Sequence, residues 1–190
     1  MSLDRVDIKL LITNPEDSDH AAYTRIFSRW VTADAERWMD IADYAHVPSG
    51  PIVMVVGDDA QFSVDAAKGE LGVLYSHRGE LSGSDTERLT TAIRTALQLT
   101  DDLEHEDDCP VRVRTDRVDI MVNDRAAYPN NADTASALQD IATAAAATVF
   151  GGAPTSVEHV GGTDQRLTVR VTLQSNVPAA QILSDAGVTV

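Results

Sequence analysis

The sequence predicts an α/β sandwich of the α+β kind, in which helices cover a mixed β-sheet. Short alternating apolar segments bounded by turn residues predict strands, and longer segments with helical apolar spacing predict helices. The pentapeptide Asp-Arg-Val-Asp-Ile occurs at residues 4–8 and again at 116–120. This recurrence indicates a duplicated β-α-β-β unit. We expect one compact domain over residues 1–190, with two pseudo-repeats at about 4–108 and 110–174.

The first elements of the chain are expected to be a strand, a long helix and a hairpin. Residues 5–13 alternate and then become apolar, which predicts a strand. Residues 20–45 are expected to form an amphipathic helix, broken near residues 32–34 and ended by the Pro-Ser-Gly-Pro sequence at 48–51. Its apolar positions are Ile26, Phe27, Trp30, Val31, Trp38, Ile41 and Ala42. Residues 52–56 and 60–65 then predict a hairpin about Gly57-Asp58-Asp59, followed by a strand at 71–76.

A second helix is expected to begin after Ser84. Ser84 and Glu87 have the spacing of a capping box, in which each side chain bonds the backbone N–H of the other. Its apolar stripe consists of Leu89, Ile93, Leu97 and Leu99. It leads into an acidic run at residues 101–108, which we interpret as a solvated connection between the halves. The alternative, a divalent-cation site, lacks the glycine and the regular oxygen spacing of a calcium loop.

The second half predicts the same order of elements. Residues 111–123 alternate like a strand, residues 134–150 form an alanine-rich helix ended by Gly151-Gly152, and residues 156–160 and 166–173 form a hairpin. The sequence at 160–165 echoes that at 56–61, with one residue inserted. Residues 178–186 predict a short terminal helix.

The net charge of -15 is the strongest global feature, and Lys9 and Lys68 are the only lysines. Dense carboxylates keep a protein hydrated when salt screens charge repulsion, so we expect a salt-adapted (halophilic) protein. The alternative is an acidic protein that binds a basic partner. Either way nucleic-acid binding is disfavoured, since phosphate neutralisation needs clustered basic residues.

No membrane association is expected, because no apolar run is long enough to span a bilayer and the N-terminus lacks a signal pattern. Cys109 is the only cysteine and cannot form an internal disulfide. We therefore expect a cytoplasmic protein.

Several short motifs resemble those of a family of uncharacterised bacterial and archaeal proteins. The resemblance rests on Phe-Ser-Arg-Trp at 27–30, on residues 43–47 before Gly50-Pro51, on Gly57, and on residues 72–78. A second set lies at residues 114–116 and 122–125. The family has no established activity, so the resemblance implies none.

Two segments contain the candidate binding residues. Asp43, Tyr44 and His46 lie where a helix is expected to end, and a histidine beside a carboxylate and a phenol can bind an anion or act as a base. Alternatively, Tyr44 packs under the sheet and His46 caps the helix. His77 and Arg78 follow a strand and can bring positive charge to the same edge as His46. The alternative for Arg78 is a pair with a surface carboxylate.

Motifs for cofactors, metals and covalent catalysis are not found in the sequence. The five histidines lack metal-ligand spacing, the glycines match no phosphate-binding loop, and no serine lies in a nucleophile elbow. We therefore expect no cofactor and no metal, and favour a non-catalytic module that binds a second protein or another copy of itself. The alternative is a small-anion-binding protein or enzyme that uses the two candidate segments.

Overall fold

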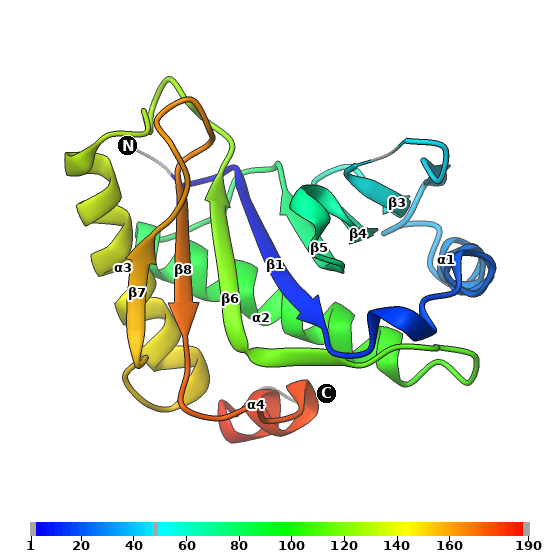
Figure 1. The fold of residues 1–190 in the computed structure, drawn as a ribbon. Coiled ribbons are helices and arrows are strands. Elements are labelled where there is room, and N and C mark those ends of the chain that lie inside the picture. Colours follow the sequence, from blue (N-terminus) through cyan, green and yellow to red (C-terminus); the bar gives the residue numbers. More distant parts are fainter. Residues whose placement is uncertain (1–2, 48, 188–190) are drawn as a thin grey trace.

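The computed structural model describes residues 3–47 and 49–187, and Figure 1 shows the arrangement of its elements. The strands are β1 (Val6–Ile12), β2 (Asp40–Asp43), β3 (Pro51–Val56), β4 (Ala60–Asp65), β5 (Gly72–His77), β6 (Val113–Val122), β7 (Ser156–His159) and β8 (Thr168–Thr172). The helices are α1 (His20–Ala33), α2 (Asp85–Glu104), α3 (Ala132–Phe150) and α4 (Ala179–Asp185), with short 3-10 turns η1 (Pro15–Asp17) and η2 (Ala67–Gly69).

The strands form one sheet in the order β2-β3-β4-β5-β1-β6-β8-β7. Because β1 pairs directly with β6, both halves of the chain share this sheet. The predicted α/β sandwich is therefore confirmed. The expected mixture of parallel and antiparallel pairs is not found, since every pairing within 3–47 and 49–187 is antiparallel. Short connections such as those between β3, β4 and β5 can join only antiparallel neighbours.

The helices cover one face of the sheet and leave the other open (Figure 1). In β1, Val6, Ile8 and Leu10 are buried in the core with the helices, and the alternate residues Asp7 and Lys9 lie on the opposite face. The core is continuous and includes residues from α1, α2, α3 and α4. The alternate positions of the central strands therefore supply the residues of the open face.

The helix ends follow the predicted capping chemistry. The Ser84 hydroxyl accepts from the Glu87 N–H, and the Glu87 carboxylate accepts from the Ser84 N–H at 2.8 Å. Asn131 caps α3, and Gly151 ends that helix with a φ of 72°, a left-handed conformation that glycine adopts without steric cost. The apolar stripe predicted for the helix after Ser84 is buried as expected; it consists of Leu89, Ile93, Leu97 and Leu99.

The long helix expected over residues 20–45 is shorter in the structure. It ends at Ala33, where the break at residues 32–34 was expected, but the segment that follows is not a second helical part and turns back to form β2 along β3. Consequently Ile41 and Ala42 lie in a strand and His46 does not cap a helix. The turn attributed to residues 48–51 begins at Pro48, which lies outside the described residues, and Gly50 within it has a φ of 118°.

The apolar positions that indicated this longer helix still cluster in space. The rings of Trp30 and Trp38 stack with centroids 6.4 Å apart, and Trp30 also stacks on Phe62 at 5.9 Å. Phe27 completes the cluster. Chain reversal after α1, rather than one helical face, thus brings the tryptophans together.

The two Asp-Arg-Val-Asp-Ile sequences lead into or lie within the central strands, and Ile8 of β1 pairs with Ile120 of β6. Each of these strands is followed by a helix, α1 or α3. Within the described residues, however, four strands follow α1 and two follow α3. The elements do not correspond one to one, and the duplication stays a prediction.

The acidic run was expected to be a solvated connection, and this expectation is wrong for most of it. Helix α2 continues through Glu104, and Asp101 is buried. Glu106 accepts from the Trp30 ring N–H at 2.6 Å and from Arg29 at 2.6 Å. These contacts anchor the run on α1, because the arginines and a ring N–H there offset its charge.

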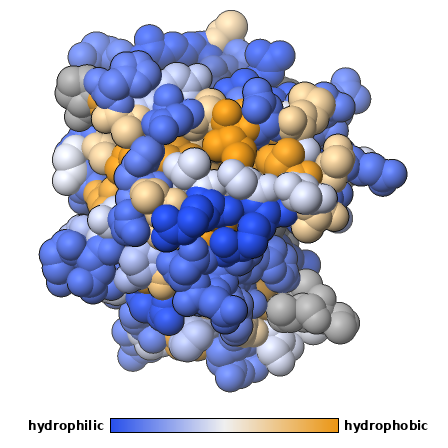
Figure 2. Space-filling model, turned by 90° about the vertical axis from the view of Figure 1, so that its right-hand side faces the viewer, coloured by the Kyte–Doolittle hydropathy of each residue, from blue (hydrophilic) through white to orange (hydrophobic). Residues whose placement is uncertain are grey.

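On the side of the molecule where α1 lies, Figure 2 shows a small group of apolar side chains bordered by hydrophilic ones. In the described part of the chain no helix is long and apolar enough to cross a membrane.

Candidate functional site

The open face of the sheet is lined by charged and polar side chains from its central strands. They come from alternate positions, such as Asp7 and Lys9 on β1, Ser76 on β5 and Asp119 on β6. Asp7, Lys9 and Asp119 are buried although they lie on this face. Burial of charge is costly unless partners compensate it, so the contacts among these groups decide what the face can bind.

A cavity of about 490 Å³ lies at one end of this face, where β1, β5 and β6 meet. It is lined by Arg5, Asp7, Ser76, His77, Arg78, Asn123 and Arg166. We call it the arginine cavity. Three guanidinium groups and one carboxylate line it, in a chain whose net charge is -15.

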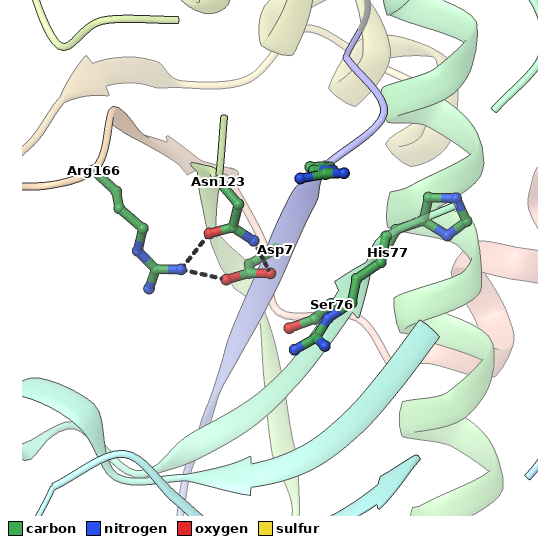
Figure 3. Close-up of a pocket in the computed structure, with 7 residues that line it drawn as sticks. Asp7, Ser76, His77, Asn123 and Arg166 are labelled. Carbon is green, nitrogen blue, oxygen red and sulfur yellow. Dashed lines mark hydrogen bonds and ion pairs between the residues drawn. The ribbon is translucent and has the colours of Figure 1, made fainter. Parts of the chain in front are cut away.

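Asp7 positions one of these arginines. Arg166 donates to the Asp7 carboxylate at 2.6 Å and to the Asn123 side-chain oxygen at 2.5 Å, and the Asn123 amide donates to Asp7 at 2.6 Å (Figure 3). The three groups form a closed polar triangle. Asp7 is thereby fully engaged, and the direction of the Arg166 guanidinium is fixed.

The other two arginines have no carboxylate partner in the part of the chain that the structure describes. Arg78 donates to the neutral side-chain oxygen of Gln61 at 2.6 Å. The Arg5 side chain has no hydrogen bond or ion pair to any described residue, and both arginines are exposed. The lining therefore has two positive charges in excess, since Asp7 offsets one of the three guanidiniums.

His77 lines the same cavity, but its ring points to the other side of β5. Figure 3 shows the ring directed away from Asp7 and Ser76. Its Nδ1 lies 3.0 Å from the Tyr75 hydroxyl, and 7% of the residue is exposed. Burial lowers the pKa of His77, while Asp59 and Asp4 partly oppose this effect. His77 therefore adds no positive charge to the arginine cavity at neutral pH.

The segment of Asp43, Tyr44 and His46 lies elsewhere. Asp43 is in the edge strand β2, where β3 and β4 separate it from β5. Its carboxylate contacts the His20 ring at 3.1 Å and the Ala45 N–H at 2.9 Å. The backbone N–H of Ala45 lowers the pKa of Asp43 most, and His20 adds to this effect. The structure brings Asp43 to His20, and the arginine cavity contains none of the three residues.

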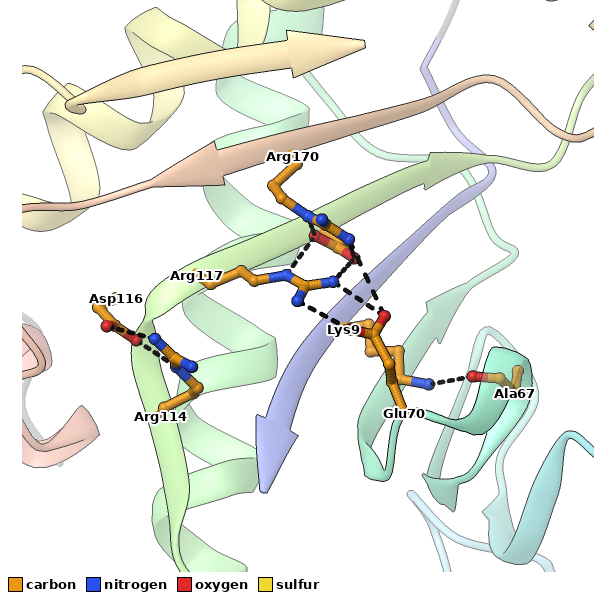
Figure 4. Close-up of polar contacts among 8 residues, drawn as sticks. Lys9, Ala67, Glu70, Arg114, Asp116, Arg117 and Arg170 are labelled. Atoms are coloured by element: carbon orange, nitrogen blue, oxygen red, sulfur yellow. Dashed lines mark hydrogen bonds and ion pairs between the residues drawn. The ribbon is translucent and has the colours of Figure 1, made fainter. Parts of the chain in front are cut away.

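A second charge network crosses the middle of the open face (Figure 4). Arg117 donates to both Glu70 oxygens at 2.9 Å and to Asp119, and Arg170 donates to both Asp119 oxygens at 2.8 and 2.9 Å. Burial raises the pKa of Asp119, but the two arginines outweigh it and the net pKa is lowered. These charges are mutually compensated.

Lys9 and Asp65 form a third, nearly buried pair at 2.6 Å. Gly72 leaves room for Lys9 beside it, because a Cβ atom there would lie 3.0 Å from the lysine Cε and 2.3 Å from the Leu10 oxygen. No residue with a side chain fits this position without displacing the backbone of β1.

The described residues contain no group of three or more histidine, cysteine, aspartate or glutamate side chains that could hold a metal ion. The lining of the arginine cavity carries an excess of positive charge.

Of the residues that line the cavity, sequence reasoning identified His77 and Arg78 and missed the other five: Arg5, Asp7, Ser76, Asn123 and Arg166. Arg5 and Asp7 lie in the first Asp-Arg-Val-Asp-Ile sequence, and Asn123 belongs to the motif at residues 122–125 on which the family resemblance partly rests. The signal that could have found them is alternation, which places Asp7 and Ser76 on the same face of neighbouring strands. Arg166 gives no such signal.

The chain matches no protein-family model, no curated protein and no solved structure. The resemblance to a family of uncharacterised proteins therefore stays a prediction, and any functional conclusion depends on the site itself.

Proposed function

We propose that this protein binds a small anion, a phosphate or a carboxylate, in the arginine cavity. The observation that supports it most is that Arg5 and Arg78 line one cavity without a carboxylate partner among the described residues. In a chain with 30 acidic residues and 15 basic ones, an arginine has many carboxylates with which to pair. Positive charge that is left uncompensated in a cavity attracts an external anion.

The guanidinium group suits this role. Its planar fork donates two parallel hydrogen bonds to a carboxylate or a phosphate, and it stays charged at all relevant pH values. Ser76 and Asn123 add neutral hydrogen-bonding groups to the lining. Asp7, held between Arg166 and Asn123, fixes one guanidinium before any ligand arrives.

Binding is favoured over catalysis by the same contacts. Asp7 is the only carboxylate among the lining residues, and Arg166 and Asn123 already engage it. Ser76 lies across from Asp7 on the neighbouring strand, but Arg166 and Asn123 already engage that carboxylate, and the His77 ring points away from the serine. A nucleophile with a free general base is therefore missing from the lining residues.

The test is isothermal titration calorimetry and thermal unfolding with phosphate, sulfate and acetate at constant ionic strength. We expect at least one of these anions to bind and to raise the melting temperature of the wild type. Arg5→Ala and Arg78→Ala should each weaken binding at least tenfold, since charge-assisted hydrogen bonds contribute about 1.5–3 kcal/mol.

Arg125→Ala is the matched control, because Arg125 is also an exposed arginine but does not line the cavity. Removing Arg125 changes the net charge of the protein by the same amount as removing Arg5 or Arg78, and it should leave the affinity for the anion unchanged. If no anion binds, or if Arg125→Ala weakens binding as much as Arg78→Ala, the proposed function is wrong.

Self-association is a second candidate function, and one specific observation favours it. The large apolar side chains that are most exposed are Met39 (55%), Tyr44 (39%) and Val47 (40%), and they flank the edge strand β2. We propose that a second copy of the chain pairs there, because an open strand edge is a template for β-pairing. Sedimentation of the wild type and of Met39→Glu tests this: a wild-type monomer would exclude it.

We further propose a cytoplasmic location. The half-buried free thiol of Cys109 supports a reducing compartment. Fractionation of cells that express the protein tests this proposal.

A further inference from the structure

A second cavity, of about 250 Å³, lies on the open face next to the arginine cavity. The loop between β7 and β8 lines it with Val160 and Gly161, and η2 lines it with Ala67 and Lys68. Its floor includes Leu74 and Met121 from the central strands. We call it the sheet cavity.

The two cavities adjoin along the strands. Arg166 lines both of them. Each of three neighbouring strands supplies successive open-face residues, one to the arginine cavity and one to the sheet cavity. These pairs are Asp7 and Lys9 on β1, Ser76 and Leu74 on β5, and Asn123 and Met121 near the end of β6. Two residues along a strand span about 7 Å, so the cavities adjoin with no element between them.

The sheet cavity differs from the arginine cavity in its charge balance. Lys9 is paired with Asp65, and Arg170 is paired with Asp119. Leu74 and Met121 add apolar surface between these pairs. Lys68, at the rim, contacts only a neutral side-chain oxygen, whereas the cations over the strands are paired. A charged group would therefore gain little over the strands, and an uncharged body with apolar surface would fit there.

Lys68 lies at the rim of the sheet cavity, and its backbone conformation is strained. It is the one described non-glycine residue with a positive φ, 61°. Its ammonium donates to the Gln165 side-chain oxygen at 3.0 Å, which joins η2 to the β7–β8 loop. A left-handed conformation in a residue other than glycine costs free energy and tends to occur at ligand sites. The strain thus coincides with the rim of the sheet cavity.

We infer that the ligand is an organic anion with a charged group at one end and a partly apolar, uncharged body at the other. The charged group lies among Arg5, Arg78 and Arg166, and the body extends along the strands over Leu74 and Met121. This inference rests on the proposed anion site and specifies which class of anion that site takes. Inorganic ions fill only the arginine cavity and do not reach the sheet cavity.

The experiment compares matched ligands by isothermal titration calorimetry at constant ionic strength: phenyl phosphate against inorganic phosphate, and benzoate against acetate. We expect the aromatic member of at least one pair to bind at least tenfold more tightly, because only it reaches the sheet cavity. Leu74→Ala should reduce this preference at least threefold and leave the affinity for the inorganic or small anion unchanged. Met121→Ala should reduce the preference as well, but it also removes the contact of the Met121 sulfur with the Arg166 guanidinium at 3.6 Å, so Leu74→Ala is the cleaner variant.

Met54→Ala is the matched control, because Met54 lies on the open face of β3 and lines neither cavity. It should leave the preference unchanged. Leu74 is half-buried, so we expect Leu74→Ala to fold. If Met121→Ala does not fold, Leu74→Ala alone provides the test.

The outcomes separate the two proposals. Equal affinity within both pairs would overturn the organic-anion inference and leave the anion site in place. A preference for the aromatic ligand that is unchanged in Leu74→Ala would also overturn this inference, because the uncharged body of the ligand would then lie outside the sheet cavity. If neither member of either pair binds, the proposed function itself fails, and the inference with it.

Discussion

The guanidinium of Arg166 lies 2.6 Å from the carboxylate of Asp7, although the two residues are 159 positions apart in the chain. Asp7 is buried in the central strand β1, and Arg166 comes from the loop before β8. The contact therefore connects the middle of the sheet to the second half of the chain. It also sets the charge of the arginine cavity.

Asp7 subtracts one charge from that cavity, so its neutralisation should strengthen anion binding. We predict that Asp7→Asn raises the affinity for phosphate or a carboxylate about fivefold, or about 1 kcal/mol, because an opposing charge is removed near the ligand. Titration calorimetry of the two proteins measures this. Asp107→Asn, at an exposed carboxylate of the acidic run, should have no effect. Weaker binding in Asp7→Asn would mean that Asp7 chiefly positions Arg166.

Removing one partner of the buried Lys9–Asp65 pair should lower the stability of the folded protein strongly. Their side chains are 8% and 3% exposed. We predict that Asp65→Ala lowers the free energy of unfolding by about 3 kcal/mol, because it leaves the Lys9 ammonium buried without its partner. Urea denaturation measures the loss.

The double variant Lys9→Met with Asp65→Leu provides the control for that prediction. It removes both charges and should recover most of the loss, because the desolvation cost disappears with the pair. A double variant as unstable as Asp65→Ala would show that packing, rather than the unpaired charge, dominates.

His77 should make the stability of the protein depend on pH near neutrality. Burial lowers its pKa from the ordinary value of 6.5. As the pH falls, the unfolded chain therefore takes up the proton first, so stability is fully present above about pH 6.5 and declines as the pH falls through the folded-state pKa. Urea denaturation between pH 7.5 and 5 should show this decline in the wild type.

His77→Gln isolates that effect, because it keeps a polar side chain and removes the titration. The difference in unfolding free energy between wild type and variant should shrink as the pH falls. A difference that stays constant over this range would contradict the assignment.

The acidic composition predicts a response to salt. With a net charge of -15, carboxylate repulsion destabilises the folded chain in dilute buffer. If the charge reflects salt adaptation, the melting temperature should rise as potassium chloride goes from dilute to molar, because the ions screen that repulsion. A flat or falling curve would count against salt adaptation.

The sheet and most helices could be predicted from the sequence because their signals are local. Alternating apolar and polar residues predicted β1, β4 and β6, and the capping box at Ser84 predicted the start of α2. The helix over residues 20–45 was predicted too long because Trp38 and Ile41 continue the helical spacing. Their burial comes from tertiary packing after a chain reversal, which periodicity cannot distinguish from a helix.

The candidate site was predicted only in part, because it is built from pairing across the chain. Arg78 was identified, but its expected neighbours Asp43, Tyr44 and His46 lie at the end of the edge strand β2 and in the turn that follows it. Its actual neighbours depend on β1 pairing with both β5 and β6, and on Arg166 reaching back from a loop. Such long-range contacts leave no periodic signal in a single sequence.

The position of a bound anion tests the central claim most directly. Crystals of the protein soaked with selenate or tungstate would locate the anion by its anomalous scattering. We predict a peak within hydrogen-bonding distance of the guanidinium groups of Arg5, Arg78 and Arg166, and no peak there in crystals of Arg78→Ala. A peak only at other surfaces, such as the side chains of His20 and His46, or no peak at all, would contradict the anion site.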